Sequence, residues 1–499
     1  MLTHPRSLAL LLSAGILTGC AVGPDYRAPE IALSSTFLGQ DGVDRRPVQR
    51  QADLTVWWAS FDDPLLTHFI SLALEQNLDI AQAAARVAQS RAALRYADAA
   101  LLPAGNISAS AARSYQSVET PFGQVLNATP GFDRSGSLYE ANLGASWEID
   151  VFGGLQRGRE AARALYEASE AGAVATRLAV AAQTADVYVT IRGLQARIAI
   201  TRQQADTRRQ LLAMVRLQYE KGIAAELQMN QADGSLTQVE AQIPVLEAGL
   251  DAAMNGLDVL LGVQPGTYRT ELAAVTPVPV APGLAASGSP ADMIRRRPDL
   301  IAAERRLAAA NAQIGVAISE YYPKFSLAAL LGSATAIASG NLFTGDASQA
   351  RGVLGLRWRL FDFGRVDAQI AAARGQEAEA LAAYRLAVLR AAEDVENAFS
   401  ALVKREAQVG ILTRGESSLA RARANSFAAY QGGVVSLIEV LDADSNLLQV
   451  RDGKAQAQTE AARAAIASFR ALGGGWDASN ASSDRLSGKL STNNRRQEK

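Results

Sequence analysis

Hydrophobic residues recur at helical spacing along most of this chain, and alanine occupies many of the positions around them. The pattern is clear at residues 64–100 and again at residues 298–320. Asp63 followed by proline is the signal of a helix N-cap with proline at the first helical position, and Ser289 followed by proline repeats it. Because alanine combines high helix propensity with a small side chain, we expect long helices that pack closely.

Two much longer helical stretches follow, at residues 154–221 and 365–430, and neither contains a proline. Each would form roughly 100 Å of helix at ~1.5 Å per residue. The chain then reverses at a glycine and returns through shorter helical stretches, which we place at residues 226–261 and 436–472. Helices of this length cannot bury themselves in one globule, so they need neighbours along their length, as in a coiled-coil bundle or a helical tube.

Alternating apolar and polar positions predict four strands, at residues 104–115, 138–151, 324–335 and 352–361. In the last of these, one face carries Leu354, Leu356, Trp358 and Leu360, and the other carries Arg357 and Arg359. This alternation is typical of a membrane strand with lipid on one side and water on the other. A soluble hairpin packed on a helix would show the same alternation, so the strands alone leave both interpretations open.

The chain contains the same arrangement twice. Residues 79–103 align without gaps with residues 299–323, at a constant offset along the chain. Residues 143–153 align with residues 354–364 at a second offset, so one short insertion separates the two matches. Two long units of helices, strand pair and helices suggest a pseudo-symmetric wall and argue against an enzyme with one unique cleft.

The start of the chain indicates secretion. Arg6 precedes a short apolar run that ends at Leu17-Thr18-Gly19-Cys20, which is the pattern of a cleaved signal peptide. Cys20 is the only cysteine, so no disulfide is possible, and its place at the cleavage point favours lipidation of its sulfur. The alternative is an ordinary signal peptide beside an incidental cysteine.

These signals divide the chain into consecutive segments. They are a signal peptide (1–19), a lipid-anchored extended arm (20–57), a first structural repeat (58–262), a proline-rich crossing (263–289), a second structural repeat (290–476) and a tail expected to be disordered (477–499). Length alone would allow about three domains of ~150 residues each. No break in composition separates independent globules, however, and the repeat outweighs that expectation.

Composition and motifs exclude several classes of function. The 499 residues have a formal net charge of −1 with both signs interspersed, which gives no reason to expect a nucleic-acid partner. His4 lies in the signal peptide and His68 stands alone on an apolar helix, most simply as a structural residue. The sequence also contains no thiol cluster, no phosphate-binding loop and no nucleophile motif, so we predict no catalytic residue and no metal site.

Closure of the strands depends on assembly. No run of about 18 apolar residues follows Cys20, so a membrane crossing would require strands closed into a barrel. Known barrels begin at about eight strands, whereas three copies of four strands would supply twelve without an exposed edge. A lipid-anchored periplasmic coiled-coil scaffold would need no lipid-facing strands and is the main alternative on the residues alone.

Several motifs together resemble a known family. They are Cys20-Ala21-Val22-Gly23-Pro24-Asp25-Tyr26, Trp57-Trp58, Arg296-Arg297-Pro298-Asp299-Leu300, Tyr321-Tyr322-Pro323, Phe361-Asp362-Phe363-Gly364, Val440-Leu441-Asp442-Ala443 and Leu472-Gly473-Gly474-Gly475-Trp476. In order and spacing they are similar to the outer-membrane efflux lipoproteins of the TolC-like superfamily, in the NodT-type branch of RND efflux outlets. The resemblance covers the whole mature chain up to Trp476.

This resemblance implies an α+β membrane protein, with a long antiparallel α-helical barrel and a transmembrane β-barrel of four strands per chain and twelve per homotrimer. It implies a passive duct that exports small molecules such as drugs, lipid-anchored in the outer membrane and extending into the periplasm. The implied partners are outer-membrane lipid, a periplasmic adaptor (membrane fusion) protein and an inner-membrane RND-type pump. No cofactor is implied beyond the covalent lipid on Cys20. A type I protein-secretion outlet remains an alternative.

The resemblance also points to residues of a periplasmic gate. In this family the tip of the helical tunnel is held shut by side chains near the threefold axis, some of them aspartates, and Asp442 stands at one such position. Glu439 lies three residues earlier on the same helix face. Three copies of each carboxylate would form rings that repel one another and favour cations. Glu439 has an alternative role, because the run from Ser436 to Glu439 fits a helix capping box.

The expected tip differs between the two repeats and from relatives. The positions related by the repeat to Glu439 and Asp442 are Gln228 and Gln231, so only the second repeat supplies acid. Ser445 and Val435 stand where some relatives place an arginine. We therefore expect a closed tip whose lock is built differently.

Two basic residues are candidates for the pore lining. Alternation in the fourth strand places Arg357 and Arg359 on the face that would line the lumen, where they would favour anions. Their alternative role is ion pairing with Glu148 and Asp150 of the neighbouring hairpin.

Overall fold

The structure is a computed structural model that describes residues 21–32, 34–46, 52–284 and 290–476. The predicted signal peptide, Cys20, the cap at Ser289 and the tail lie outside these residues. The described chain forms two compact units, and both units draw on both sequence repeats. The strand unit takes its described residues from Met1–Pro29, Ala88–Ala168 and Ala303–Ala383, and the helix unit takes its described residues from Glu30–Val87, Ser169–Ala302 and Tyr384–Lys499.

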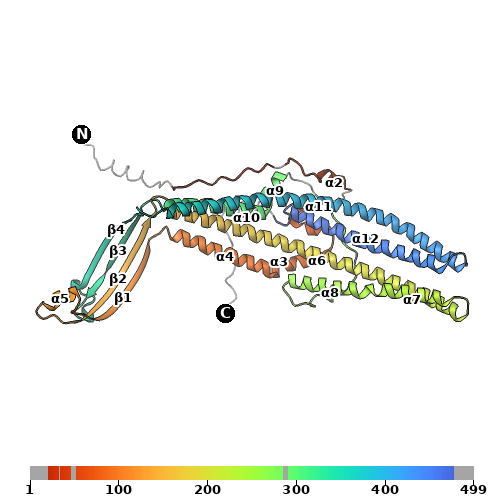
Figure 1. Cartoon of the computed structure of the whole chain (residues 1–499), viewed down its shortest axis with the longest axis horizontal. Coiled ribbons are helices and arrows are strands. Elements are labelled where there is room, and N and C mark those ends of the chain that lie inside the picture. Colours follow the sequence, from red (N-terminus) through yellow and green to blue (C-terminus); the bar gives the residue numbers. More distant parts are fainter. Residues whose placement is uncertain (1–20, 33, 47–51, 285–289, 477–499) are drawn as a thin grey trace. The chain divides into compact units, whose positions relative to one another are not determined.

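Helices dominate the described chain (Figure 1). They are α2 (Gln40–Asp44), α3 (Pro64–Gln76), α4 (Leu78–Ala99), α5 (Pro121–Asn127), α6 (Gly154–Glu220), α7 (Glu226–Glu240), α8 (Gln242–Leu260), α9 (Pro290–Arg296), α10 (Pro298–Ser319), α11 (Arg365–Gln431) and α12 (Leu437–Ala471), with short 3-10 turns η1 (Leu54–Phe61), η2 (Ser339–Asn341) and η3 (Gly345–Ala347). The two long proline-free stretches are indeed single helices, because α6 and α11 have 67 residues each. Within the described ranges, no helix combines the length and the apolar character needed to cross a membrane.

The returning stretch of the first repeat is not the single helix that we predicted. It consists of α7 and α8, which are separated at Ala241. Pro244 explains the break, since proline has no backbone N–H and its ring would clash with the carbonyl of Glu240 in a continuous helix. The second repeat has no proline in this stretch, and α12 continues for 35 residues.

Four strands form one antiparallel sheet in the order β1-β2-β3-β4. Their bounds are β1 (Ala104–Tyr115), β2 (Ser135–Ile149), β3 (Lys324–Thr335) and β4 (Ser348–Arg357). Strands β1 and β3 lie where the sequence predicted them. Strand β4 begins and ends earlier than predicted, so the predicted positions of Trp358 and Arg359 within it are wrong. Arg357 pairs with Lys324, the first residue of β3, and Pro323 before it has no N–H with which to extend the ladder.

The start of α3 is fixed to α6 through one aspartate. Asp63 is the N-cap, as predicted, and its Oδ1 accepts hydrogen bonds from the backbone N–H groups of Leu65 and Leu66, both at 3.0 Å. Its other oxygen accepts a 2.8 Å bond from the hydroxyl of Tyr188 in α6. Burial raises the pKa of Tyr188 to about 12, so the hydroxyl remains a donor to Asp63.

Small and aromatic residues let the helices of the helix unit pack closely. A Cβ at Gly193 of α6 would overlap the side chain of Thr459 in α12, so only glycine permits this approach. Trp57 stacks on Phe469 of α12 with ring centroids 5.3 Å apart, and Phe69 of α3 is fully buried. Alanines are also fully buried in these helices, for example Ala185 in α6 and Ala465 in α12, both 0% exposed, so alanine lies at close contacts between helices as expected.

In the strand unit, the start of the described chain is an extended arm held by a buried arginine. Residues 21–32 contain no helix or strand. Arg157 of α6 donates to the carbonyls of Val22 at 3.0 Å and Gly23 at 3.3 Å, and it pairs with Asp25 at 2.8 Å. Gly23 also lies against Gly315 so closely that a Cβ would meet the Gly315 backbone at 2.5 Å.

Candidate functional site

The four-stranded sheet has one apolar and one polar face, and this is the first candidate site. The strand register groups the odd positions of β1, β2 and β3 with the even positions of β4. One face therefore carries Ile107, Leu143, Trp147, Leu327, Leu331, Leu354 and Leu356, and the other carries Asn106, Asn142, Glu148, Ser326, Gln349, Arg351 and Arg357. Ile107 is 83% exposed and Leu354 is 74% exposed, so a single chain leaves the apolar face uncovered.

On the polar face, glycines leave room for the asparagine side chains of the neighbouring strands. Asn106 of β1 lies over Gly144 of β2, where a Cβ would stand 2.8 Å from its Oδ1. Asn142 lies over Gly332 of β3 in the same way, and its Oδ1 accepts a 2.7 Å hydrogen bond from Nε2 of Gln349 in β4. The amide groups of Asn106 and Asn142 therefore lie over glycines on the polar face, and that of Asn142 is joined to Gln349 by a hydrogen bond.

Strands β1 and β4 are the two edges of this sheet, since each pairs with only one neighbour. An edge strand exposes unpaired backbone N–H and C=O groups along one side, and such groups pair readily with another chain. An apolar face without a cover and two open edges together indicate a sheet that is incomplete in a single chain.

Two repeat-related tryptophans attach the sheet to the helices that precede its hairpins. The indole N–H of Trp147 donates to the carbonyl of Leu101 at 3.0 Å, and that of Trp358 donates to the carbonyl of Tyr321 at 2.9 Å. Trp147 and Trp358 are related by one offset of the repeat, and Leu101 and Tyr321 by the other. The duplication seen in the sequence therefore extends to matching hydrogen bonds.

The two candidate pore arginines have different surroundings. Arg357 is the last residue of β4 and lies on the polar face, opposite Lys324. Arg359 lies beyond the strand and pairs with Glu320 at 3.0 Å, rather than with Glu148 or Asp150. Asp150 instead accepts a 2.7 Å bond from the backbone N–H of Gln156 in α6, and Glu320 also binds Lys324.

The second candidate site is the pair of turns that reverse the long helices. The turn between α6 and α7 contains Gly222 with φ +72°, and the turn between α11 and α12 contains Gly433 with φ +75°. The following residue of each turn, Ile223 or Val434, donates its N–H to the carbonyl five residues earlier, at 2.8 Å and 2.9 Å. Glycine adopts this left-handed conformation without strain, which explains the helix ends predicted there.

Both turns expose apolar side chains at repeat-related positions. They are Ile223 (74% exposed) and Leu227 (66%) in the first turn, and Val434 (80%) and Ile438 (59%) in the second. Beneath them, Leu211, Val215, Ala232, Leu437 and Val440 form a buried cluster that packs the two hairpins together. Exposed apolar groups beside a well-packed core are typical of a surface that binds another protein.

The two predicted gate residues lie on the surface of α12. Asp442 is exposed and accepts a 3.1 Å bond from Nδ2 of Asn446. Glu439 is also exposed, and the alternative capping role is wrong, because within the described chain its carboxylate accepts no bond from the N–H of Ser436 and the Ser436 side chain caps no N–H of α12. In the first repeat, Gln228 does bond back to the N–H of Ala225 at 3.0 Å. An exposed carboxylate is well hydrated, which removes the need for such a bond at Glu439.

A buried acidic group near these turns was not among the predicted site residues. Asp444 of α12 is 1% exposed, and its Oδ1 accepts a 2.8 Å bond from Nε of Arg423 in α11. Arg208 of α6 is also buried and donates to the carbonyl and hydroxyl oxygens of Ser235 in α7, at 2.9 Å and 2.6 Å. Burial lowers the pKa of Arg208, and the charge of Asp444 partly offsets this.

The sequence did contain a signal for Asp444. Leu437, Val440, Asp444 and Leu447 are buried and follow the 3-4-3 spacing of a buried helix face. An acidic residue in such a row is expected only with a partner inside the protein. Within the described chain, Asp444 Oδ2 and Arg208 Nε have no hydrogen-bond partner, so this cluster is incompletely satisfied.

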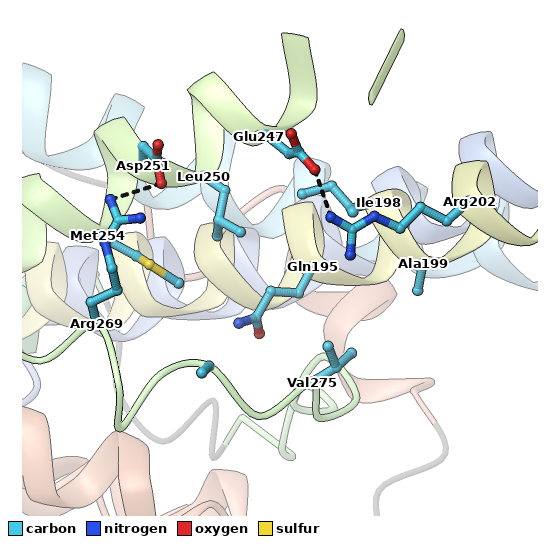
Figure 2. A pocket seen from close by; sticks show the side chains of 11 residues that line it. Gln195, Ile198, Ala199, Arg202, Glu247, Leu250, Asp251, Met254, Arg269 and Val275 are labelled. Atoms are coloured by element: carbon cyan, nitrogen blue, oxygen red, sulfur yellow. Dashed lines mark hydrogen bonds and ion pairs between the residues drawn. The ribbon is translucent and has the colours of Figure 1, made fainter. Parts of the chain in front are cut away.

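A cavity of about 230 Å³ lies between α6, α8 and the segment that follows α8. Figure 2 shows its two ion pairs, Arg202 with Glu247 at 2.6 Å and Arg269 with Asp251 at 2.9 Å. Because each arginine is already paired with a carboxylate, the cavity offers no unpaired positive charge to a ligand. We assign it no function.

The described residues contain no group of three or more His, Cys, Asp or Glu arranged to hold a metal ion. His68 is half-exposed, and its Nε2 lies 3.9 Å from Oε1 of Glu271. The sheet and the turns are therefore the two candidate sites, and both are surfaces rather than clefts.

Comparison with known proteins gives consistent matches along the chain. Residues 69–263 and 290–474 match the family described as outer membrane efflux protein. The pyoverdine export outer membrane protein OpmQ of Pseudomonas putida is 32% identical over 482 residues, which cover 96% of this chain and 99% of that protein. Nodulation protein T of Rhizobium leguminosarum bv. trifolii is 30% identical, with 93% of this chain and 96% of that protein covered. Among solved structures, the outer-membrane channel OprN has a TM-score of 0.81 at 30% identity, over 92% of this chain and 100% of that one.

Proposed function

This chain belongs to the outer membrane efflux protein family and is an efflux duct of the outer membrane, and on this basis we propose that it works as a homotrimer. The duct is passive and performs no catalysis. A periplasmic adaptor protein connects it to an inner-membrane RND-type pump, which supplies the energy for export.

The main support for this proposal is the sheet, which has one apolar face, one polar face and two unpaired edges. In a trimer, β1 of one copy pairs with β4 of the next, so three sheets close into twelve strands and no edge remains. The apolar face then contacts lipid, and the polar face with Asn106, Asn142 and Gln349 lines a water-filled lumen. Neither contact is available to a periplasmic scaffold, which would leave the apolar face in water.

The exposed apolar residues of the turns support a protein partner. Ile223 and Leu227 in one turn and Val434 and Ile438 in the other repeat around a threefold axis as six similar patches. A patch of this kind suits the adaptor, which must contact each copy in a similar way.

The exported compounds are small molecules rather than proteins. Relatives carry names that refer to pyoverdine export, antibiotic efflux and toluene efflux, and these compounds differ widely in polarity. A shared duct for such different compounds supports the view that the pump, and not this chain, selects the substrate. The names give no support to a type I protein-secretion outlet.

A lipid on Cys20 anchors the amino-terminal arm in the outer membrane. Cys20 lies outside the described residues, but the arm that follows it is held in place by Arg157 and by the contact of Gly23 with Gly315. The first of these contacts, from Arg157 to the carbonyl of Val22, lies two residues after the cysteine. The lipid would therefore enter the membrane close to the strand unit. Removal of residues 1–19 as a signal peptide is part of this proposal.

The turn of the second repeat forms the gate. Three copies of Asp442 and of Glu439 surround the axis, where their repulsion is balanced by the packing beneath them. We expect Asp442→Ala to loosen the closed tip, with higher single-channel conductance in planar bilayers and greater sensitivity of cells to large antibiotics. Gln231→Ala, at the related position of the first repeat, is the matched control. It should leave both the conductance and the antibiotic sensitivity unchanged. Unchanged conductance for Asp442→Ala would remove the gate role.

The polar face of the sheet sets the ion preference of the lumen. Arg357 lies on this face, whereas Arg359 lies beyond the strand and is paired with Glu320. We therefore expect Arg357→Ser, but not Arg359→Ser, to shift the reversal potential in a salt gradient towards cation preference.

Deletion and complementation test the function directly. A strain without this chain accumulates a fluorescent small-molecule substrate of the cognate pump, and the wild-type chain restores its export. A chain in which Leu354 and Leu356 are both changed to aspartate places charge on the apolar face and fails to restore export. Full export by this variant would contradict the membrane role of the sheet.

A further inference from the structure

The apolar face of the sheet carries one charged residue within its four strands, Arg113. The register places Arg113 of β1 on the same face as Ile107 and Leu143. Every other position of that face in the strands is an apolar, small, hydroxyl-bearing or aromatic residue. Arg113 is exposed and makes no hydrogen bond or ion pair with any residue that the structure describes. A charge that faces lipid hydrocarbon is costly, so the depth of Arg113 in the membrane decides its role.

Strand geometry places Arg113 at the border of the apolar band. Arg113 stands opposite Ser137, which lies on β2 near the end away from Ile149. The distance from Ile149 to Ser137 is roughly 40 Å along the strand, or about 30 Å across a membrane after allowing for a strand tilt near 40°. The apolar band of an outer-membrane barrel is about 25 Å tall. Ile149 and its neighbours Phe325 and Leu356 mark one border, so Arg113 lies just beyond the other, among the lipid headgroups.

A second arginine and two tyrosines lie at the same end of the sheet. Arg134, immediately before β2, has its guanidinium 4.4 Å from the ring centre of Tyr115, and its Nε donates to the carbonyl of Gln116 at 3.2 Å. Tyr115 shares the apolar face with Arg113, and Tyr139 is on this face as well, opposite Ala111. Tyrosines are enriched where protein meets the headgroup region, which supports the depth given by the strand geometry. The ring of Tyr115 and the Gln116 carbonyl fix the Arg134 guanidinium beside the membrane face.

We propose that Arg113 and Arg134 form a binding surface for the phosphate groups of outer-membrane lipids. A guanidinium presents paired N–H donors that match two oxygens of a phosphate, and a cation on the lipid-facing side of a barrel has only headgroups to neutralise it. Three copies would place three such surfaces around the outside of the sheet. The inference rests on the proposed membrane-spanning role of the sheet and adds a specific lipid chemistry to it.

The test measures lipid retained on the purified full-length protein by native mass spectrometry. The probe is lipid A, a lipid with two phosphate groups, and the comparison lipid has the same acyl chains without phosphate. We expect the wild type to retain lipid A in preference to the comparison lipid. Arg113→Gln should weaken lipid A binding about fivefold, as should Arg134→Gln, and the double variant should lose most of the preference. Arg351→Gln, on the polar face, removes the same charge and keeps wild-type binding.

Two results would overturn the inference. One is equal retention of the two lipids by the wild type, and the other is unchanged lipid A binding by the double variant. The same spectra report how many chains are assembled. An assembled protein without phosphate preference would therefore contradict only the lipid surface, whereas a wild type that does not assemble would contradict the proposed function.

Discussion

The two helical hairpins of the helix unit share one backbone plan but differ in chemistry. Both reverse at a glycine with positive φ, and both expose two apolar residues on the turn. The second hairpin buries Asp444, whereas the related residue of the first, Asp233, is exposed. Arg423, which pairs with Asp444, corresponds to Leu212 in the first hairpin. The duplication thus preserves the turns and the 67-residue length of α6 and α11, while the buried acid at Asp444 and the carboxylates at Glu439 and Asp442 are specific to the second hairpin.

The two hairpins also differ in the continuity of their returning helices and in the charge near their turns. The first hairpin is interrupted at Ala241, shortly before Pro244, and carries Gln228 and Gln231 on its turn side, and neither residue is charged. The second is unbroken and presents Glu439 and Asp442. At these related positions the first hairpin therefore presents uncharged amides and the second presents carboxylates.

The largest effect should come from removing the buried acid. Asp444→Ala leaves Arg208 and Arg423 without their negative partner inside the protein, and we expect it to lower the free energy of unfolding by about 3 kcal/mol. The measurement is urea unfolding of the detergent-extracted protein, followed by circular dichroism. Asp233→Ala is the matched control and should change stability by less than about 0.5 kcal/mol. Equal effects of the two substitutions would show that the hairpins do not differ here.

A smaller loss should follow from overpacking a close contact between α6 and α12. Gly193→Ala places a methyl group against Thr459 of α12 and should cost about 2 kcal/mol by overpacking. Within the described chain, a Cβ at Gly172 of the same helix would meet no atom within 4 Å. Gly172→Ala should therefore stabilise the protein by about 0.5 kcal/mol, through helix propensity alone. Thermal unfolding of both variants gives the comparison, and a shift of the same sign in both would contradict the close contact.

Acid should weaken the second hairpin through Glu416 of α11. The hydrogen bond from Lys454 at 2.9 Å, followed by that from Arg451 at 3.1 Å, lowers the pKa of Glu416 although burial opposes this. A lowered pKa in the folded state stabilises the protein above the unfolded pKa of about 4.3, and this contribution is lost as the pH falls through the folded value.

The Glu416 contribution should be small because the three side chains are partly exposed to solvent. We expect about 0.5–1 kcal/mol, seen as a steeper fall of wild-type stability between pH ~5 and pH ~3 than in Glu416→Gln. The related position of the first hairpin is Ala205, which cannot titrate. Parallel pH profiles for the wild type and the variant would rule out this contribution.

The smallest difference concerns the starts of α7 and α12. Gln228 bonds back to the N–H of Ala225, so Gln228→Ala should cost about 0.5 kcal/mol. Glu439→Ala should leave stability nearly unchanged, because the capping arrangement is not formed there. A larger loss for Glu439→Ala than for Gln228→Ala, in the same unfolding experiment, would reverse this part of the comparison.

Much of the fold could be predicted from the sequence because its signals are local. The absence of proline and the glycines at the reversals set α6 and α11 to within a residue or two of their observed bounds. The break between α7 and α8 is also a local effect, and it could have been predicted from the position of Pro244 alone. The end of β4 could not, because it depends on which residue of β3 lies opposite Arg357.

The site was predictable only in part. Asp442 was found through the resemblance, and its exposure agrees with a surface role, although no contact in a single chain tests it as a gate. Arg423 reaches Asp444 only when α11 and α12 fold back on each other, and Arg208 comes from α6 of the other hairpin, so neither neighbour of Asp444 could be identified from local sequence. The partner of Arg359 proved to be Glu320, which lies just before β3, because the chain leaves the sheet after Arg357.

The central claim is that three copies of this chain close their sheets into one duct, and the number of chains per particle tests it most directly. Native mass spectrometry of the protein extracted from outer membranes in detergent, compared with the denatured chain, gives this number. The account predicts three chains per particle. A stable monomer would leave the edges of β1 and β4 unpaired, and a stable dimer would supply two sheets instead of three, so either result would contradict the claim.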